Sequence, residues 1–369
     1  MVKEPRSAST ARLLLCVLLF LLSGFTSTVW ACRLLEPPVP ATDVLWVHLE
    51  GLCFSADQRE WAVKGADILE ALKAGKSLDL QGILVEDDVM LDQLPIQSTA
   101  EIPRIPQRIH DRLMQQGIEK IRVIPGALTI RDSQIEKVLA TNLVNDFLVI
   151  LGTVDVSGTT FLQSVDFSNI IFAKPVIMTN VNVEHEGFFI QAQFEDTVDF
   201  SHTKFGTHSR FHKAMFRSPV NFSDVEFQGV AEFLEVEFLQ TVNFSRANFM
   251  SGTGFSGSVF HGPVDFLAVK AKRETYFRFS EFKDRVSFRR GQFQNVVDFS
   301  NSRFEGAHDF SKGEFAVQPD FTASNISVDV SVSNRKVNQQ SQWLLFGGLL
   351  LLVGICLWIF KRKTWSPSA

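Results

Sequence analysis

Residues 220–249 read VNFSDVEFQGVAEFLEVEFLQTVNFSRANF, and the spacing of their phenylalanines decides the fold. The steps from Phe222 to Phe227, and from there to Phe233 and Phe238, alternate between five and six residues. The chain of 369 residues contains 35 Phe and a single Tyr. An ordinary core mixes side chains of different shapes so that they interlock. One residue type used this heavily therefore indicates one core position that is occupied many times.

The alternation extends in both directions as two series, each with a period of 11 residues. The first series is Phe167, Met178, Phe189, Phe200, Phe211, Phe222, Phe233, Phe244, Phe255, Phe266, Phe277, Phe288, Phe299, Phe310 and Phe321. The second series follows five residues later and is Phe172, Val183, Phe194, Phe205, Phe216, Phe227, Phe238, Phe249, Phe260, Ala271, Phe282, Phe293, Phe304, Phe315 and Ile326. All of these residues are bulky and apolar except Ala271, so we expect them to share one continuous core.

Two structures use a period of 11 residues, and local patterning separates them. A right-handed helical supercoil has this period, but the segment is rich in Phe, Val, Ser, Thr and Gly, which disfavours helix. A Val often stands two residues before a first-series Phe, as in Val220 and Phe222, with a polar residue between them. Side chains two apart face the same way on an extended chain. We therefore predict short strands in four-sided coils of 5+6+5+6 residues, stacked into an all-β solenoid.

The unit small–polar–Phe–x–x resembles the pentapeptide-repeat family in its Phe-centred form. This resemblance implies a right-handed quadrilateral β-helix and covers Val154 to about Ile326 tightly. One departure is regular, because every second unit carries a sixth residue in the turn after the second Phe. We expect alternate corners to be wider than those of the plain five-residue repeat.

Weaker copies of the repeat lie upstream, in irregular first coils that we place at residues 78–153, ahead of the regular β-helix at 154–333. The positions that keep the spacing are Leu80, Val85, Leu91, Ile96, Ile124, Ile130, Ile135, Ile150, Val156 and Phe161. We expect insertions at about residues 97–118 and 136–149.

The N-terminal segment, residues 32–77, is predicted to hold a capping helix at about residues 56–74. Ser55 and Gln58 have the spacing of a capping box, and Gly75 follows the predicted helix. Its apolar side is Trp61, Ile68, Leu69 and Leu72. A solenoid end exposes unpaired strand edges, so an amphipathic helix there has a physical purpose.

Both ends of the chain carry address-like sequences. Residues 1–31 have basic residues, an apolar run at 13–25, and Val29 and Ala31 at a plausible cleavage site. This order predicts a secretory signal peptide, with an uncleaved anchor as the alternative. After a linker at 334–342, residues 343–360 are apolar without interruption. That length is about the minimum for a transmembrane helix.

Lys361, Arg362 and Lys363 begin a tail at residues 361–369 that we expect to be cytoplasmic. The predicted localisation is therefore single-pass in a membrane, with the bulk of the chain periplasmic or extracellular. A sorting signal that is removed after export is the alternative, although no LPxTG-like motif precedes the span.

Four cysteines are present, and two of them fall in the predicted exported part. Cys16 lies in the predicted signal peptide and Cys356 in the predicted span. An oxidising compartment permits Cys32 and Cys53 to form a disulfide. A lipidated or free Cys32 remains open as an alternative.

The sequence offers no convincing catalytic, cofactor-binding or metal-binding residue. The exported part contains no HExxH, GxSxG, CxxC, Walker or GxGxxG motif. Glu186 and His208 are one coil apart and should stack beside His185, but His202 and His212 add little to a metal site. Asp199, Asp265, Asp298, Asp309 and Asp320 recur at one repeat position, which indicates a structural role.

Two further surface features have simple interpretations. The densest basic cluster is diluted by acidic residues and is interpreted as a solvated face; it comprises Lys270, Lys272, Arg273, Arg278, Lys283, Arg285, Arg289 and Arg290. The NxS sequons at Asn221, Asn243 and Asn325 follow from the repeat consensus.

The net charge of −5 implies no nucleic-acid partner. Members of the pentapeptide-repeat family that mimic DNA and protect gyrase act in the cytoplasm, and predicted export argues against that role. We expect a non-enzymatic, membrane-tethered scaffold or protein-interaction module without cofactor or small-molecule substrate. The alternatives are an accessory subunit of a membrane transporter or channel, and an enzyme acting on polysaccharide.

Overall fold

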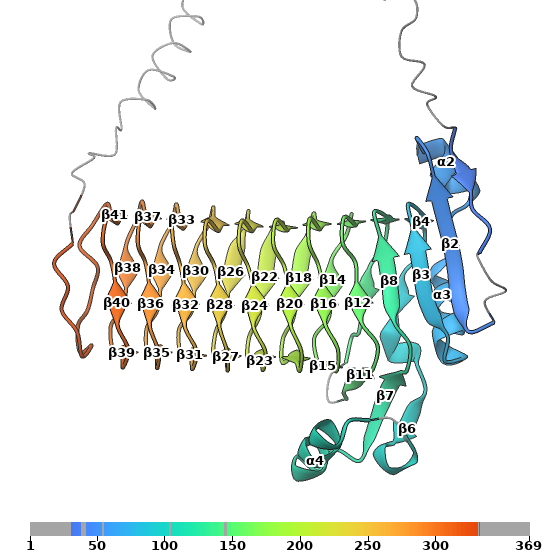
Figure 1. The fold of residues 1–369 in the computed structure, drawn as a ribbon, viewed down its shortest axis with the longest axis horizontal. Coiled ribbons are helices and arrows are strands. Elements are labelled where there is room, and N and C mark those ends of the chain that lie inside the picture. The colour runs from blue at the N-terminus through green and yellow to red at the C-terminus, as the bar shows by residue number, and fades with distance from the viewer. Residues whose placement is uncertain are drawn as a thin grey trace, which may run out of the picture.

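The computed structural model describes residues 31–37, 42–53, 55–102, 105–143, 146–330 and 332. These residues form an all-β solenoid of about nine turns with few helices, shown lengthwise in Figure 1. Four sheets run along the rod, and the chain visits them in a fixed order in each coil. We number the sheets as faces 1 to 4 in that order.

Faces 1 and 2 begin each coil, and their strands follow one another along the rod. Face 1 comprises β1 (Arg33–Leu34), β2 (Val44–Glu50), β3 (Ser77–Gln81), β8 (Leu128–Arg131), β12 (Val154–Asp155), β16 (Val176–Ile177), β20 (Val198–Asp199), β24 (Val220–Asn221), β28 (Val242–Asn243), β32 (Val264–Asp265), β36 (Val286–Ser287) and β40 (His308–Asp309). Face 2 comprises β4 (Leu84–Val85), β9 (Gln134–Ile135), β13 (Thr160–Phe161), β17 (Asn182–Val183), β21 (Lys204–Phe205), β25 (Glu226–Phe227), β29 (Asn248–Phe249), β33 (Lys270–Ala271), β37 (Gln292–Phe293) and β41 (Glu314–Phe315).

Faces 3 and 4 complete each coil. Face 3 comprises β5 (Val89–Met90), β10 (Leu139–Ala140), β14 (Val165–Asp166), β18 (Glu186–Phe188), β22 (His208–Arg210), β26 (Val230–Glu232), β30 (Thr253–Gly254), β34 (Thr275–Tyr276) and β38 (Val297–Asp298). Face 4 comprises β6 (Ile96–Ser98), β7 (Lys120–Ile124), β11 (Leu148–Ile150), β15 (Ile170–Phe172), β19 (Gln193–Phe194), β23 (Met215–Phe216), β27 (Glu237–Phe238), β31 (Val259–Phe260), β35 (Glu281–Phe282) and β39 (Arg303–Phe304).

The register confirms the predicted coil of 22 residues. Each strand of the regular part pairs in parallel with the equivalent strand of the next coil, as in Val198 with Val220 on face 1 and Phe205 with Phe227 on face 2. Only β1 and β6 pair antiparallel to their neighbours among the strands that the structure describes. The strands are too short to pair within a coil, so the ladder between coils supplies the hydrogen bonds of the backbone.

The core is built from columns of phenylalanine. First-series residues belong to faces 1 and 3, and second-series residues belong to faces 2 and 4. Phe189 stacks on Phe211 one coil away, with ring centroids 4.7 Å apart and an interplanar angle of 2°. Across the core Phe189 meets Phe200 edge to face at 82°. Stacked contacts along the rod and T-shaped contacts across it are both favoured ring geometries, so phenylalanine fills every layer without voids.

The corner after each first-series residue is a tight turn. The carbonyl oxygen of Phe189 accepts the N–H of Ala192 at 3.2 Å, and Gln191 between them has a φ of 55°. This is the pattern of a type II turn, which needs a positive φ at its third residue. The same left-handed residue recurs every 11 positions from Asn169 to Ala323. The five-residue step therefore contains one strained corner in each half-coil.

The predicted capping helix at residues 56–74 is wrong as a single element. The chain forms α2 (Ser55–Glu60) and α3 (Gly65–Lys73) instead. Val63 between them is extended and bridges to Val85, because its N–H donates to the Leu84 oxygen at 2.8 Å. Gln58 donates its side-chain amide to the Gly82 oxygen at 3.1 Å, so it does not complete a capping box. The second helix buries Ile68, Leu69 and Leu72 and contacts β2, β3 and β5.

The first coils differ from the prediction at two places. Residues 136–149 continue the solenoid, because β10 pairs in register with both β5 and β14. The spacing places Ile96 in the core, but Ile96 lies in the antiparallel strand β6 and is 50% exposed. Leu91 begins a short 3-10 helix, η1 (Leu91–Gln93), although its side chain is buried. The spacing alone therefore does not distinguish true coils from this local departure.

Residues 97–118 form an insertion, as expected. After β6 the chain makes the 3-10 helix η2 (Thr99–Glu101) and helix α4 (Gln107–Gln115), which project from the rod beside β7 in Figure 1. Ile109 and Leu113 of α4 pack on the outer side chains of face 4, Val149 and Ile171 among them, in a cluster separate from the phenylalanine core. This arm covers face 4 only where that face carries apolar outward residues.

The two predicted addresses lie outside the described residues. These are the signal peptide up to residue 30, the linker at 334–342, the span at 343–360 and the tail at 361–369. Within the ranges that the structure does describe, no helix has both the length and the apolar character to cross a membrane.

Candidate functional site

The interior of the solenoid is filled by its own side chains. The largest fully buried residues are phenylalanines, from Phe161 through Phe238 along the rod. Because the core has no room for a ligand, the functional surfaces to consider are the four outer faces, the arm at α4 and the two ends of the rod.

A continuous groove runs along the outside of face 1. One part, of about 640 Å³, spans β28 to β40, and the adjoining part, of about 350 Å³, spans β16 to β28. Thr241 and Asn243 line both parts, so the two form one channel, which we call the face-1 groove. Its floor is the outward residue of each strand, namely Ile177, Asp199, Asn221, Asn243, Asp265, Ser287 and Asp309.

The floor of the groove is a ladder of side-chain hydrogen bonds. Asn221 donates its amide to Asp199 Oδ1 at 3.1 Å, and Asn243 donates to Asn221 Oδ1 at 3.1 Å. The same oxygens accept backbone N–H groups two residues later, as Asp199 Oδ1 does from Ser201 at 2.8 Å. These bonds align the polar row with the backbone and hold it rigid.

The recurring aspartates are used in this structural way, as predicted. Their Oδ1 atoms accept the N–H two residues later at 2.8 Å in every case, and the residues are Asp199, Asp265, Asp298, Asp309 and Asp320. Hydrogen bonds from Ser311 hold the pKa of Asp309 below its usual range, and the positive charge of Arg289 adds to this effect. These carboxylates therefore stabilise turns.

The predicted stack of Glu186 on His208 is confirmed, because the two residues are partners in adjacent strands. They do not form one site, however. Glu186 accepts a hydrogen bond from the Ser164 hydroxyl. His208 Nε2 instead lies 2.9 Å from Glu232 Oε2, which also lies 3.1 Å from His212 Nε2.

Glu232 is the centre of this small polar cluster on face 3. Arg210 Nε lies 3.3 Å from the same Glu232 oxygen. Burial on its own would raise the pKa of Glu232, but the His208 hydrogen bond and the charges of His212 and Arg210 lower it. Within the described ranges no three His, Cys, Asp or Glu residues are arranged to hold a metal ion. The cluster is therefore an ion-pair network with one shared carboxylate.

The basic cluster at residues 270–290 does not form one patch. Lys270 lies on face 2, whereas Arg278 lies beyond face 3, where it pairs with Asp298 at 2.5 Å and stands 4.7 Å over the Tyr276 ring. Arg285 and Arg289 flank face 1. The residues are dense in sequence but are distributed around the rod.

A buried ion-pair network was missed from the sequence. The side chain of Glu195 is fully buried, and its carboxylate lies 2.5 Å from Arg112 and 3.3 Å from Arg108, both on α4. Arg217, one coil further, lies 3.1 Å away. Nothing in the spacing pairs residue 195 with an arm 83 residues earlier. This network fixes the arm to the solenoid.

The sequon asparagines are occupied structurally. Asn221 and Asn243 belong to the groove ladder. Asn325 accepts the N–H of Phe304 and donates to the Phe304 oxygen, both at 2.8 Å. Its side-chain amide therefore takes the place of the next strand on face 4. The interpretation of the sequons as part of the repeat agrees with these contacts.

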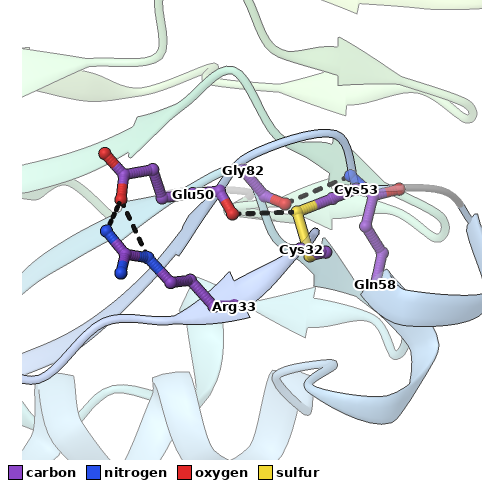
Figure 2. Close-up of a disulfide and its surroundings, with 6 residues drawn as sticks. All are labelled: Cys32, Arg33, Glu50, Cys53, Gln58 and Gly82. Carbon is purple, nitrogen blue, oxygen red and sulfur yellow. Dashed lines mark hydrogen bonds and ion pairs between the residues drawn. A yellow bond between two sulfur atoms is a disulfide. The ribbon is translucent and has the colours of Figure 1, made fainter. Parts of the chain in front are cut away.

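Figure 2 shows the disulfide at the start of the rod. Cys32 and Cys53 are joined, with Cα atoms 4.6 Å apart. The bond holds β1 along the edge of β2, where Arg33 pairs with Glu50 at 2.5 Å. Of the alternatives open for Cys32, the structure shows pairing with Cys53.

Comparisons with known proteins agree with the repeat but extend over a small part of the chain. The family model described as pentapeptide repeats, with 9 copies, matches residues 222–270. No curated protein and no solved structure matched. The parallel strand ladder continues in the same register beyond both ends of the match, from β12 to β41. Over residues 222–270 the chain is similar to pentapeptide repeats, and its solenoid is longer than that similarity.

Proposed function

We propose that this protein is a non-enzymatic, membrane-tethered β-helix that acts as a scaffold or protein-interaction module outside the cytoplasm. The observation that carries the proposal is the solid rod: its phenylalanine core leaves four long outer faces and no internal site among the described residues. Repeat rods of this type present extended surfaces on which partners bind. The match to pentapeptide repeats supports the same role.

Export rests on three observations. The Cys32–Cys53 disulfide is typical of an oxidising compartment. Residues 1–31 have the order of a signal peptide. Residues 343–360 have the length and composition of a membrane anchor, followed by basic residues. We further propose that the coil is right-handed, as parallel crossovers nearly always are, and that α3 with β1 caps its first turn.

Two alternatives are distinguishable from this proposal. An accessory subunit of a membrane transporter or channel would bind its partner through residues 343–360. An enzyme acting on polysaccharide would need free carboxylates clustered beside a groove. The aspartates of face 1 instead use one oxygen each to accept a hydrogen bond of their own turns. This use favours binding over catalysis.

The test is a crosslinking pull-down from native membranes with the full-length protein and with a form that lacks residues 343–369. A partner that both forms retain supports an interaction module. A partner that only the full-length form retains would move the assignment to a membrane-complex subunit. If neither form captures a partner, the scaffold proposal fails.

A further inference from the structure

The face-1 groove has the dimensions of a site for an extended polymer. It crosses the strands from β16 to β40, which are seven consecutive members of one sheet. At about 4.8 Å between neighbouring strands the groove is about 29 Å long. Every coil contributes the same pair of elements, one floor residue and one rim residue. A site with such a repeat selects a ligand with a matching repeat.

The rim alternates apolar rings and hydroxyls along its length. Pro175, Pro219 and Pro263 alternate with Thr197 and Thr241, one residue per coil. The floor below them carries carboxylate, amide and hydroxyl groups held by the ladder. Each Asp of the floor has one oxygen bound to its own turn, which leaves the second oxygen available to a ligand in the groove. Polar groups beside apolar ring faces suit a sugar, which has both hydroxyl edges and C–H faces.

The repeat distance separates a sugar chain from a peptide. An extended peptide rises by about 3.4 Å per residue, so its side chains on one side recur at about twice that distance. Neither value matches a strand spacing of about 4.8 Å. A β-1,4-linked pyranose chain advances by about one strand spacing per ring. Such a chain can place one ring over each coil and keep that match along the groove.

The charges of the groove favour a neutral chain. Asp199, Asp265 and Asp309 lie on its floor, whereas Arg285 and Arg289 lie at its two rims on either side of Ser287. Both arginines are exposed and have no ion-pair partner in the described part of the chain. A polyanion would meet the aspartates at several coils, and a polycation would meet the arginines. Carboxylate and guanidinium groups both hydrogen-bond hydroxyls well, so the mixture suits an uncharged ligand.

We propose that the face-1 groove binds a neutral, β-1,4-linked linear polysaccharide, with one sugar ring over each coil between β16 and β40. The inference deepens the proposed function and rests on its placement of the rod outside the cytoplasm, where such polymers occur. Each coil contributes a weak contact, and contacts in series add because one bound ring holds the next at high local concentration.

The test uses the full-length protein and two sets of neutral oligosaccharides, of β-1,4-linked glucose and of β-1,4-linked N-acetylglucosamine, from two to six sugars. Calorimetry is expected to show binding to one set, tightening by at least about tenfold from two sugars to six. Thr241→Trp fills the junction of the two parts of the groove and should abolish this binding. Thr241 is exposed, and its side chain makes no hydrogen bond to any residue that the structure describes.

Val296→Trp is the matched control, because Val296 stands at the equivalent position before β38 on face 3 and is 39% exposed. It should bind the sugars like the wild type, and thermal unfolding should show that both variants fold. Affinity that does not depend on length, equal loss in both variants, tighter binding of an acidic polysaccharide, or no binding at all would each overturn the inference. A protein partner still captured by Thr241→Trp would leave the proposed scaffold role intact.

Discussion

The left-handed residues of the five-residue corners bear the main backbone strain of the rod. Most of these positions hold a polar residue, but Phe279 has a φ of 56° and is 63% exposed. A bulky residue with a Cβ has a steric cost in this region that is smaller for Asn. Phe279 also adds an exposed aromatic surface without packing in return.

Phe279→Asn should therefore stabilise the protein by about 1 kcal/mol, measured by chemical denaturation. Val317→Asn is the control, since Val317 is 49% exposed but does not have a positive φ. If both substitutions change stability equally, relief of backbone strain is not the cause.

Glu232 gives the rod a defined acid sensitivity. Burial opposes its charge, yet His208, His212 and Arg210 lower its pKa in the folded state. A carboxylate whose pKa is depressed on folding stabilises the fold above its unfolded value and loses that contribution as pH falls. Glu232→Gln should cost stability at neutral pH, and the difference from wild type should shrink below pH 4.5. Denaturation at a series of pH values measures this, and a difference that stays constant down to about pH 3 would refute it.

At the scale of elements, helix α4 depends on a carboxylate that belongs to another part of the chain. Glu195 is fully buried beside Arg112 and Arg217. Removing one partner of a buried ion pair leaves the other charges unpaired, which costs about 3–5 kcal/mol. Because the arm lies outside the coils, its release does not require the rod to unfold.

Glu195→Gln should therefore speed hydrogen exchange in α4 and leave exchange in β28 to β41 unchanged. Glu235→Gln is the matched control, because Glu235 pairs with Lys213 on the surface, where an ion pair contributes little. Slow exchange in α4 of the Glu195 variant would mean that Ile109 and Leu113 hold the arm by packing alone.

The last coil is closed by a side chain instead of a strand. Asn325→Ala removes both hydrogen bonds to Phe304 and should destabilise β39 by about 1–2 kcal/mol. Ser327→Ala destroys the same sequon but keeps the amide, so it should be neutral. Hydrogen exchange at Phe304 reports the result. Equal effects of the two substitutions would point to the sequon and not to the hydrogen bonds.

At the scale of the molecule, coils contact only their neighbours, so damage at one end should stay there. The disulfide closes a loop with a sequence separation of 21 residues, which corresponds to about 3 kcal/mol. Cys53→Ser should therefore loosen β1 and β2 under limited proteolysis, while β28 to β41 resist as before. A loss of protection along the whole rod would show that the solenoid unfolds as one unit.

The regular part of this rod was predictable because its physics is local and repeated. Phe222 and Phe227 reveal strand, turn and coil length within a few residues, and each later copy repeats the same information. The break between α2 and α3 was not predictable, because it depends on the pairing of Val63 with Val85 in the first coil. Ile96 keeps the spacing but lies in an antiparallel strand.

The candidate sites were less predictable than the fold. The aspartates were recognisable as structural because of their repeat position, and the sequons for the same reason. The face-1 groove was not recognisable, since its depth depends on how rim and floor residues of seven coils stand together. Glu195 gave no signal, because its partners come from an insertion outside the repeat.

The closure by Asn325 has a consequence for how this rod ends. Parallel strands in register with columns of identical stacked rings are the arrangement of a cross-β fibril, which grows because each new layer copies the surface below it. Here a single chain supplies all the layers, so the same arrangement must be stopped by its own sequence. Asn325 occupies the hydrogen bonds that a further layer would take, and Ile326 and Val328 cover the last rings. A fibre-like core thus has a finite length because its final layer is made of a different material.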